Sequence, residues 1–189
     1  MALDIFFPSD GFHRMGSPLY LILHGYNGGS DDAYIRDFID KQRARGSTVA
    51  VMVSRGMMGS PIINDTLPNF ARTSDVHATV KALRKLQSHN QTIAGLGYSM
   101  GGVILANYVA KYGNDCQLDV AISISSALDA RKQIKFKRSK LMWEPLITGM
   151  MKLYIEKNFR HVIKHLEEDI YLKFLYATDV PSLDEAISR

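Results

Sequence analysis

The 189-residue sequence predicts an α/β protein with a mostly parallel sheet and crossover helices. Three observations support this fold class. Short apolar runs alternate with amphipathic stretches over residues 1–128, which is typical of β-α-β units. A serine between glycines, in the stretch GYSMG, stands between an apolar run and a helical pattern. Residues 129–189 show helical spacing only, which predicts a helical insertion over a sheet core within one domain.

Four strands and three helices are expected in the sheet core. The strands are apolar runs bounded by turn residues, and they cover 19–25, 47–55, 92–99 and 118–126. The first helix is expected to begin with Ser30 as its N-cap and with Asp31 and Asp32 in its first turn, and to stop at Gly46. The other helices are expected at 74–89 and 99–113, and the buried face of the former contains Val76, Val80, Leu83 and Leu86.

Two further helical patterns follow the sheet core, at 144–158 and 158–175. The apolar stripe of the first contains Leu146, Ile147, Met150, Met151 and Tyr154, and that of the second contains Phe159, Val162, Ile163, Leu166 and Ile170. His161 and His165 lie four residues apart in the second pattern, where they could share a metal ion with Asp169. A polar edge of a surface helix is the favoured interpretation, so no metal site is predicted.

The composition excludes several classes of protein. A hydrophobic content of 46% with 22% charged residues is ordinary for a soluble globular domain. The single cysteine, Cys116, excludes an internal disulfide and a cysteine-based zinc site. The sequence shows neither a secretory signal pattern nor an apolar run of the roughly 20 residues that a membrane span needs. A cytoplasmic location is therefore expected.

A basic run at 131–140 carries much of the net charge of +4, with six basic residues in ten. The favoured interpretation is a solvated face, and the second is peripheral contact with anionic lipid headgroups or phosphates. The residues that would make this contact are Arg131, Lys132, Lys135, Lys137, Arg138 and Lys140. Nucleic acid is not an expected partner, because no aromatic platform accompanies the run beyond Phe136.

The stretch at 97–101 fits the pattern G-x-S-x-G and predicts that Ser99 is a nucleophile. A sharp turn between a strand and a helix exposes such a serine, and bulky residues at Gly97 or Gly101 would clash there. Gly102 allows the helix to approach the sheet. The free N–H groups and the positive dipole end of the helix suit a developing oxyanion. A glycine-rich turn used only for packing is the alternative.

A second motif, LHGYNGG at 23–29, follows the first expected strand. It offers a backbone turn at the place where the second part of an oxyanion hole is needed. The predicted oxyanion donors are the backbone N–H groups of Tyr26 and Met100. His24 is expected to orient this loop through hydrogen bonds and not to act as a base, since it lies at a strand end beside the oxyanion hole.

With both motifs in view, the chain resembles the α/β-hydrolase family. It looks most like the branch of medium-chain fatty-acid ester synthase/esterases and related ABHD-type lipid hydrolases. The matching segments are ALDIF (2–6), LILHGYNGGSDDAYI (21–35), VSRGMMGSP (53–61), GYSMGGVILANYV (97–109), AISISSALD (121–129) and SLDEAISR (182–189). The resemblance implies a serine hydrolase that needs no cofactor.

The resemblance also implies what is missing. In that family the catalytic acid and then the histidine lie far downstream of the serine, beyond a segment like 182–189. We therefore expect an incomplete α/β-hydrolase fold, truncated before both residues, with no acid and no general base in this chain. Asp129 follows the last expected strand, but it matches a turn aspartate of the family with a structural role. None of the other histidines, His13, His77, His89, His161 and His165, is expected to be the base.

The predicted function is that of a carboxylesterase or acylglycerol-lipase-like serine hydrolase. It acts on acyl or lipid esters through an acyl-enzyme, and the acyl group could also pass to an alcohol. Met57, Met58, Met150 and Met151 could line an acyl pocket, although core packing is favoured for the last two. The alternative function is a non-catalytic truncated isoform or fragment that binds a lipid or a protein partner.

Overall fold

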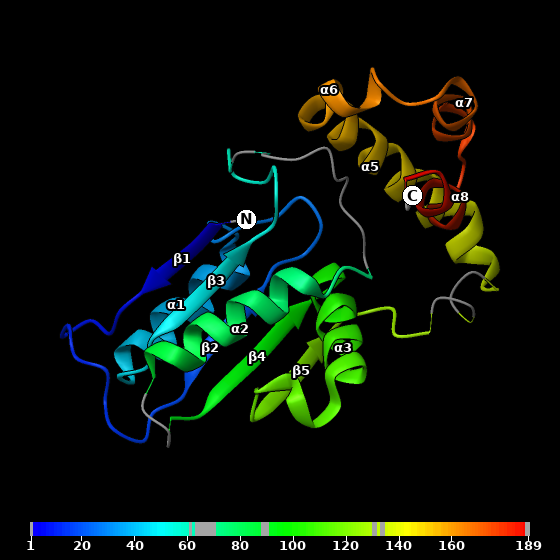
Figure 1. Cartoon of the computed structure of the whole chain (residues 1–189). Helices are drawn as coiled ribbons and strands as arrows, with labels where there is room; N and C mark the ends of the chain where they lie inside the picture. The colour runs from blue at the N-terminus through cyan, green and yellow to red at the C-terminus, as the bar shows by residue number, and fades with distance from the viewer. Residues whose placement is uncertain are drawn as a thin grey trace. The chain divides into compact units, whose positions relative to one another are not determined.

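The computed structural model describes residues 2–60, 62, 71–87, 91–129, 132 and 135–187 (Figure 1). The chain divides into two compact units. One unit, hereafter the sheet unit, comprises Met1–Ser60 and Phe70–Leu128. The other, the helical unit, comprises Pro61–Asn69 and Asp129–Arg189.

The sheet unit is built on a mostly parallel sheet, as the sequence predicts, but the sheet has five strands and not four, because residues 2–6 add an edge strand. Its strands are β1 (Ala2–Phe6), β2 (Leu19–Leu23), β3 (Val49–Val53), β4 (Ile93–Tyr98) and β5 (Val120–Ile124), in the spatial order β1-β3-β2-β4-β5. The pairs β2–β3, β2–β4 and β4–β5 are parallel, whereas β1 runs antiparallel to β3. The carboxyl ends of the parallel strands therefore meet along one edge, where sites of such folds are found.

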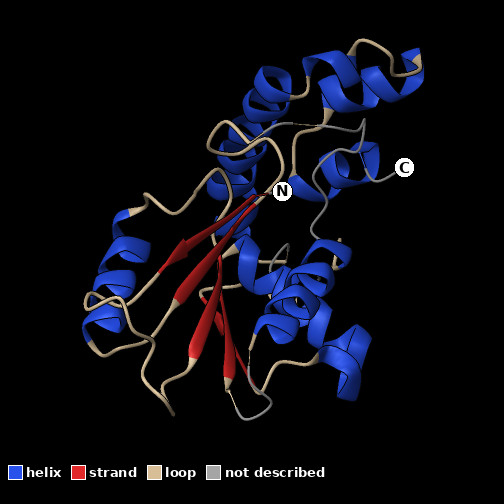
Figure 2. Ribbon diagram, turned by 60° about the vertical axis from the view of Figure 1, so that its left-hand side comes forward, coloured by secondary structure: helices blue, strands red, loops and turns tan. Residues whose placement is uncertain are grey.

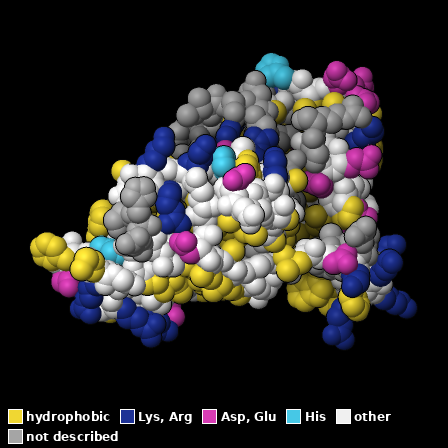
Figure 3. Space-filling model, turned by 60° about the horizontal axis from the view of Figure 1, so that its bottom comes forward, with side chains coloured by type: hydrophobic (Ala, Val, Ile, Leu, Met, Phe, Trp, Pro, Cys, Tyr) yellow, Lys and Arg dark blue, Asp and Glu magenta, His cyan; other side chains and the backbone are white. Residues whose placement is uncertain are grey.

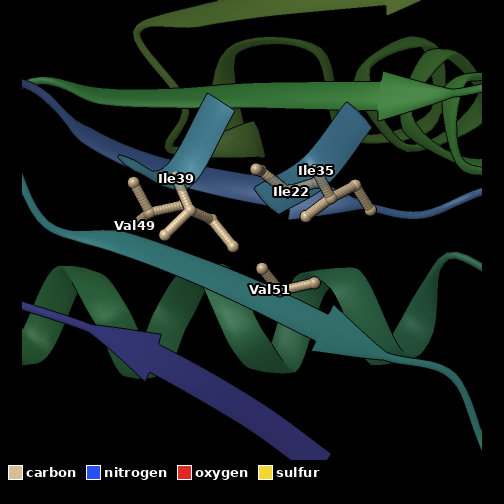
Figure 4. Packing of buried hydrophobic residues seen from close by; sticks show 5 residues of the cluster. All are labelled: Ile22, Ile35, Ile39, Val49 and Val51. Atoms are coloured by element: carbon tan, nitrogen blue, oxygen red, sulfur yellow. The ribbon is translucent and has the colours of Figure 1, made fainter. Parts of the chain in front are cut away.

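Helices cover both faces of this sheet (Figure 2). Helix α1 (Ala33–Ala44) lies on one face, and helices α2 (Ser74–Leu86) and α3 (Met100–Tyr112) lie on the other, followed by a 3₁₀ turn, η1 (Gly113–Cys116). The α1 face is closed by a cluster of fully buried aliphatic side chains from α1, β2 and β3 (Figure 4). Its members are Ile22, Ile35, Ile39, Val49 and Val51. Burying these side chains supplies most of the driving force that fixes α1 on the sheet.

Two details of the sheet unit differ from the expectations. Ser30 is not the N-cap of the first helix, because α1 begins at Ala33 with Asp32 as its N-cap. The Ser30 hydroxyl instead donates to the carboxylate of Asp4 on β1, at 2.6 Å. Leu86 is not part of the buried face of α2, since its side chain is 78% exposed at the last residue of the helix.

The described residues of the helical unit beyond 129 fold into helices joined by short turns. A single π-helical turn, η2 (Ser139–Trp143), leads into α5 (Glu144–Asn158), which is followed by α6 (Arg160–Ile163), α7 (Glu168–Tyr176) and α8 (Val180–Ile187). The buried carboxylate of Glu144 accepts the N–H of Val180 at 2.9 Å, which ties the first turn of α5 to α8. Lys152 reaches the carbonyl of Leu175 at 2.6 Å and ties α5 to α7.

The prediction of a single helix at 158–175 is wrong, because the helical structure is interrupted between Ile163 and Glu168. Glu167 is the N-cap of α7, and two more acids follow in its first turn. Negative charge is favourable at a helix N-terminus, so this acidic run suits a new helix start better than a helix interior. The interruption also removes the i,i+4 argument for a metal site that includes His165 and Asp169.

The buried face of α5 differs from the predicted stripe. Met151 and Tyr154 are buried as expected, together with Thr148 and Ile155. Three members of the predicted stripe point away from this face and are exposed, namely Leu146, Ile147 and Met150. Within the described part of the chain, no helix is long and apolar enough to cross a membrane.

Candidate active site

Ser99 occupies a sharp turn between the end of β4 and the start of α3. Its backbone has φ 50° and ψ −113°, a combination that residues with a side chain rarely adopt and that costs on the order of 1–3 kcal/mol. Two sets of hydrogen bonds hold it there. The Ser99 N–H donates to the carbonyl of Ile124 at 2.9 Å, and the Ser99 carbonyl accepts from Gly102 and Val103, which starts the helix. The result is an exposed serine side chain at the carboxyl end of the sheet.

The glycines around Ser99 are required by close backbone approach. A Cβ atom on Gly97 would lie 2.5 Å from the carbonyl oxygen of Gly101, and one on Gly101 would lie 2.6 Å from that of His24. A Cβ atom on Gly102 would lie 2.8 Å from the carbonyl oxygen of Gly97. Each distance is shorter than van der Waals contact permits. The turn therefore presses the first residues of α3 against the ends of both β2 and β4.

The turn that follows β2 lies directly beside this serine. A Cβ atom on Gly25 would be 3.6 Å from the Cβ of Ser99. The turn closes through a hydrogen bond from Gly28 N–H to the Gly25 carbonyl at 3.2 Å, and Asn27 takes φ 56° within it. Tyr26 is the half-buried residue after Gly25 in this turn. Met100 is the first residue of α3, whose N–H has no acceptor within its own helix.

Asp32 and Tyr34 hold this turn from the α1 side, and the sequence argument assigned no such role to either residue. Asp32 Oδ2 accepts the N–H of Gly29 at 3.2 Å and the hydroxyl of Tyr34 at 3.0 Å. The Tyr34 oxygen in turn accepts the N–H of Gly25 at 3.4 Å. Burial raises the pKa of the Tyr34 hydroxyl, and the Asp32 carboxylate adds to that rise, so Tyr34 stays protonated and able to donate.

The ring of His24 is buried beneath the turn and uses both nitrogens in hydrogen bonds. Its Nε2 accepts the N–H of Ser54 at 3.0 Å, so the ring proton lies on Nδ1, which donates to the Gly25 carbonyl at 2.7 Å. The expectation that His24 orients the loop is thus confirmed. Burial lowers the pKa of His24, and this outweighs the hydrogen bond to Gly25 and the nearby charges of Asp32 and Asp31, which raise it.

This depressed pKa predicts a pH dependence of stability. An unfolded histidine has a pKa of about 6.5, so below that pH the unfolded chain binds a proton that the folded ring resists. We expect the unfolding free energy of wild type to decrease as pH falls below about 6.5, by up to about 1.4 kcal/mol per pH unit from this group. The His24→Asn variant has no such group and should not show this decrease. Urea unfolding of both proteins between neutral and mildly acidic pH measures the difference. Identical slopes would contradict a buried neutral His24.

Two other described histidines of the sheet unit are engaged away from Ser99. His13 hydrogen-bonds to Thr48 Oγ1 and to the Ser17 carbonyl, both at 2.9 Å. Those partners precede β3 and β2 and so lie at the amino ends of the strands, opposite the end where Ser99 stands. His77 stacks on the ring of Tyr112 at the far end of α3, with ring centroids 4.1 Å apart. Neither ring is placed to act as a base for Ser99.

The remaining candidates fall outside the sheet unit or outside the described positions. His89 and Arg131 lie outside the described residues, as does the side chain of His161. His165 is exposed and belongs to the helical unit. Asp129 accepts the N–H of Lys132 at 3.2 Å and pairs with its ammonium group at 3.8 Å, which is the local turn role expected from the sequence.

The four candidate pocket methionines have different environments. Met57 is buried, and the thioether of Met58 accepts the N–H of Ser30 at 3.1 Å. A Cβ atom on Gly29 would collide with Met58, so this side chain lies against the turn that carries Tyr26. In α5, Met151 is buried and Met150 is exposed.

A mostly parallel sheet with helices on both faces, and an exposed serine in a strained strand-to-helix turn beside a glycine-rich loop, define the α/β-hydrolase class. The chain belongs to the α/β-hydrolase family whose sequence model is described as serine aminopeptidase S33, which matches residues 18–171.

Relatives support the lipid-hydrolase branch named by the sequence resemblance. The chain is 28% identical to the monoacylglycerol lipase of Saccharomyces cerevisiae over 80% of its own length and 34% of that protein. It is 24% identical to phospholipase ABHD3 of Bos taurus over 92% of its own length and 43% of that protein. The chain thus spans less than half the length of these curated relatives.

Solved structures agree with the fold. The esterase Pf2001 of Pyrococcus furiosus superposes with a TM-score of 0.54 at 17% identity, over 87% of this chain and 62% of that one. The esterase Est1E of Butyrivibrio proteoclasticus gives a TM-score of 0.52 at 17% identity, over 79% of this chain and 52% of that one. At these identities the likeness concerns the fold alone.

Proposed function

We propose that this chain carries the nucleophile and the oxyanion hole of a serine hydrolase that acts on acyl esters. Ser99 Oγ attacks the ester carbonyl, and the N–H groups of Tyr26 and Met100 stabilise the negative charge that forms on its oxygen. The alcohol leaves and the acyl group stays on Ser99 as an acyl-enzyme. The observation that carries this proposal is that Ser99 is exposed in a strained backbone conformation and that Gly25 of the neighbouring turn lies directly beside it.

Lipid esters are the proposed substrate class. Two related proteins are named a monoacylglycerol lipase and a phospholipase, and both names refer to lipid substrates. Met58 lies against the oxyanion turn, and its flexible thioether side chain suits contact with an acyl chain. Water completes hydrolysis of the acyl-enzyme, whereas an alcohol in its place would make the same site an acyltransferase.

The proton acceptor in this proposal lies outside the described part of the sheet unit. His13, His24 and His77 are each engaged in other contacts, as shown above. The attacking serine must lose its proton in the first step, and the departing alcohol must gain one. A histidine oriented by an acid performs both transfers in serine hydrolases, and we propose that such a pair completes this site.

A second candidate function is non-catalytic binding of a lipid or a protein partner. The edge strand β5 favours it, because Val120 and Ile122 are exposed on the sheet face that α1 covers only in part. Exposed strand edges with apolar side chains are surfaces on which other chains pair. This candidate predicts no covalent chemistry at Ser99, which separates it from the first.

Covalent labelling tests the proposal. In imidazole buffer, which supplies a proton acceptor, a fluorophosphonate is expected to add once to the chain, and peptide mapping should place the adduct on Ser99. Ser99→Ala should abolish the adduct. Ser125→Ala is the matched control, because Ser125 also has a positive φ of 52° one residue after the neighbouring strand, and it should label like wild type. A monoacylglycerol should slow labelling, while glycerol should not. An adduct that persists in Ser99→Ala would refute the nucleophile assignment.

A further inference from the structure

We propose that the surface formed by residues 132 and 135–153 binds the headgroup region of an anionic membrane. We call it the basic–apolar surface. Its described basic members are Lys132, Lys135, Lys137, Arg138 and Lys140. Its apolar members are the exposed side chains Phe136, Leu141, Met142, Trp143, Leu146, Ile147, Met150 and Leu153. The proposal is independent of the chemistry assigned to Ser99.

The apolar part of this surface is one continuous face of a helix. Trp143, Leu146, Met150 and Leu153 recur at spacings of three and four residues and are 51%, 54%, 52% and 68% exposed. The opposite face of α5 is the one that packs within the helical unit, through Thr148, Met151, Tyr154 and Ile155. Packing therefore already uses one side of α5, and a second apolar side is left in contact with water. Contiguous exposed apolar surface of this kind marks an interaction site.

The charge next to this face is strongly positive. Between residues 130 and 155 the sequence has a single acid, Glu144, and its carboxylate is buried and bound to the N–H of Val180. Two lysines of this surface interact with acids: Lys132 pairs with Asp129 at 3.8 Å, and the charge of Lys140 adds to the hydrogen bonds from Ser182 that lower the pKa of Asp179. Among the described residues, no ion pair joins Lys135, Lys137 or Arg138 to an acid.

Basic and apolar side chains in this combination select a membrane surface as the partner. In the face that Figure 3 draws, hydrophobic side chains lie directly beside Lys and Arg side chains at the right-hand side. Interfacial helices bury Trp, Phe and Leu among the lipid headgroups while Lys and Arg reach the anionic phosphates. The sequence alone favours a solvated basic face. The exposed apolar face beside it, which only the structure shows, changes that interpretation.

The single tryptophan makes this proposal directly measurable, since Trp143 lies within the surface. With vesicles of phosphatidylcholine and phosphatidylserine, the fluorescence of Trp143 is expected to shift to shorter wavelength and to be quenched by brominated acyl chains. High salt should weaken the effect, because lipid charge is screened. With phosphatidylcholine alone the shift should be much smaller. A shift that depends on protein concentration without vesicles would indicate self-association and overturn the proposal.

Two sets of variants separate the charge from the apolar face. The triple variant Lys135→Gln, Lys137→Gln, Arg138→Gln should bind anionic vesicles about a hundredfold more weakly, from roughly a fivefold loss per basic residue near the surface. The matched control changes three exposed lysines elsewhere, Lys81→Gln, Lys85→Gln and Lys164→Gln, and should bind like wild type. Equal losses in both triple variants would mean that net charge alone drives binding and would overturn the site.

The variant Met150→Ser, Leu153→Ser keeps the charge and should reduce the blue shift of Trp143 and the quenching by brominated lipid. Both side chains are exposed, so the fold should not depend on them. An unchanged shift in this variant would remove the apolar face from the binding surface.

Discussion

Imidazole added to the chain is expected to accelerate the labelling of Ser99 in proportion to the concentration of its neutral form. The reason is that His24 holds Ser54 N–H and the Gly25 carbonyl, and His13 and His77 are engaged far from the serine. A positioned base contributes about 10²–10⁴ to such reactions, and a free base contributes less because it is not held in place. We expect a rise on the order of tenfold to a hundredfold.

The measurement is the initial rate of adduct formation by intact mass spectrometry, at constant pH and increasing imidazole. Because the mass of the intact protein is measured, fluorophosphonate that imidazole hydrolyses in solution is not counted as adduct. Ser99→Ala controls for adducts on other side chains and should show no imidazole-dependent product. A rate that is already fast and does not respond to imidazole would mean that the chain carries its own base.

The sequence was sufficient to locate the serine turn, because that motif is defined by local constraints. Gly97, Gly101 and Gly102 are required by atoms within a few residues or at the ends of paired strands, and a short pattern records that requirement. The buried role of His24 could also be inferred, since it follows directly from a position at a strand end beside the turn.

The residues that support the turn from the α1 side were not predictable in the same way. Asp32 reads as an ordinary acid near a helix start, yet its carboxylate holds Gly29 and Tyr34. Ser30 reads as an N-cap, yet its hydroxyl reaches Asp4, 26 residues earlier in the chain. The Ser30 contact depends on how β1 packs on the sheet, whereas the partners of Asp32 lie only two and three residues away in the sequence. A preference for a helix cap indicates neither of these contacts. The signal that could have pointed to them is the polar run SDDAY directly after the glycine turn.

Helix α5 shows a different limit of pattern arguments. Its apolar residues cover two faces, so periodicity predicts a helix and leaves open which face is buried. The structure buries Met151 and Tyr154 and exposes Leu146 and Met150. The same ambiguity explains why the sequence favoured core packing for Met150, which instead belongs to the basic–apolar surface.

Gly101→Ala is expected to destabilise the sheet unit by about 3 kcal/mol or more, at or above the upper end of what overpacking usually costs. The added methyl would meet the carbonyl oxygens of Leu23 and His24 and the carbonyl carbon of Leu23, the last at 2.6 Å. These are backbone atoms at the end of β2, whose last residue pairs with Gly97 of β4. They cannot retreat without loosening the pairing on which the Ser99 turn is built, so labelling of Ser99 should fall together with stability.

The same substitution at two other glycines of helices gives a graded control. Gly102→Ala meets the hydroxyls of Ser126 and Ser123, which can rotate, but also the Gly97 carbonyl at 2.8 Å, so its cost should be intermediate. Gly149→Ala in α5 meets nothing within 4 Å and should be neutral or stabilising by up to about 1 kcal/mol, because alanine favours the helix. Denaturant unfolding followed by circular dichroism, with hydrogen exchange of the β2 and β4 amides, ranks the three. If Gly101→Ala were as stable as Gly149→Ala, α3 could not lie as close to β2 as the serine turn requires.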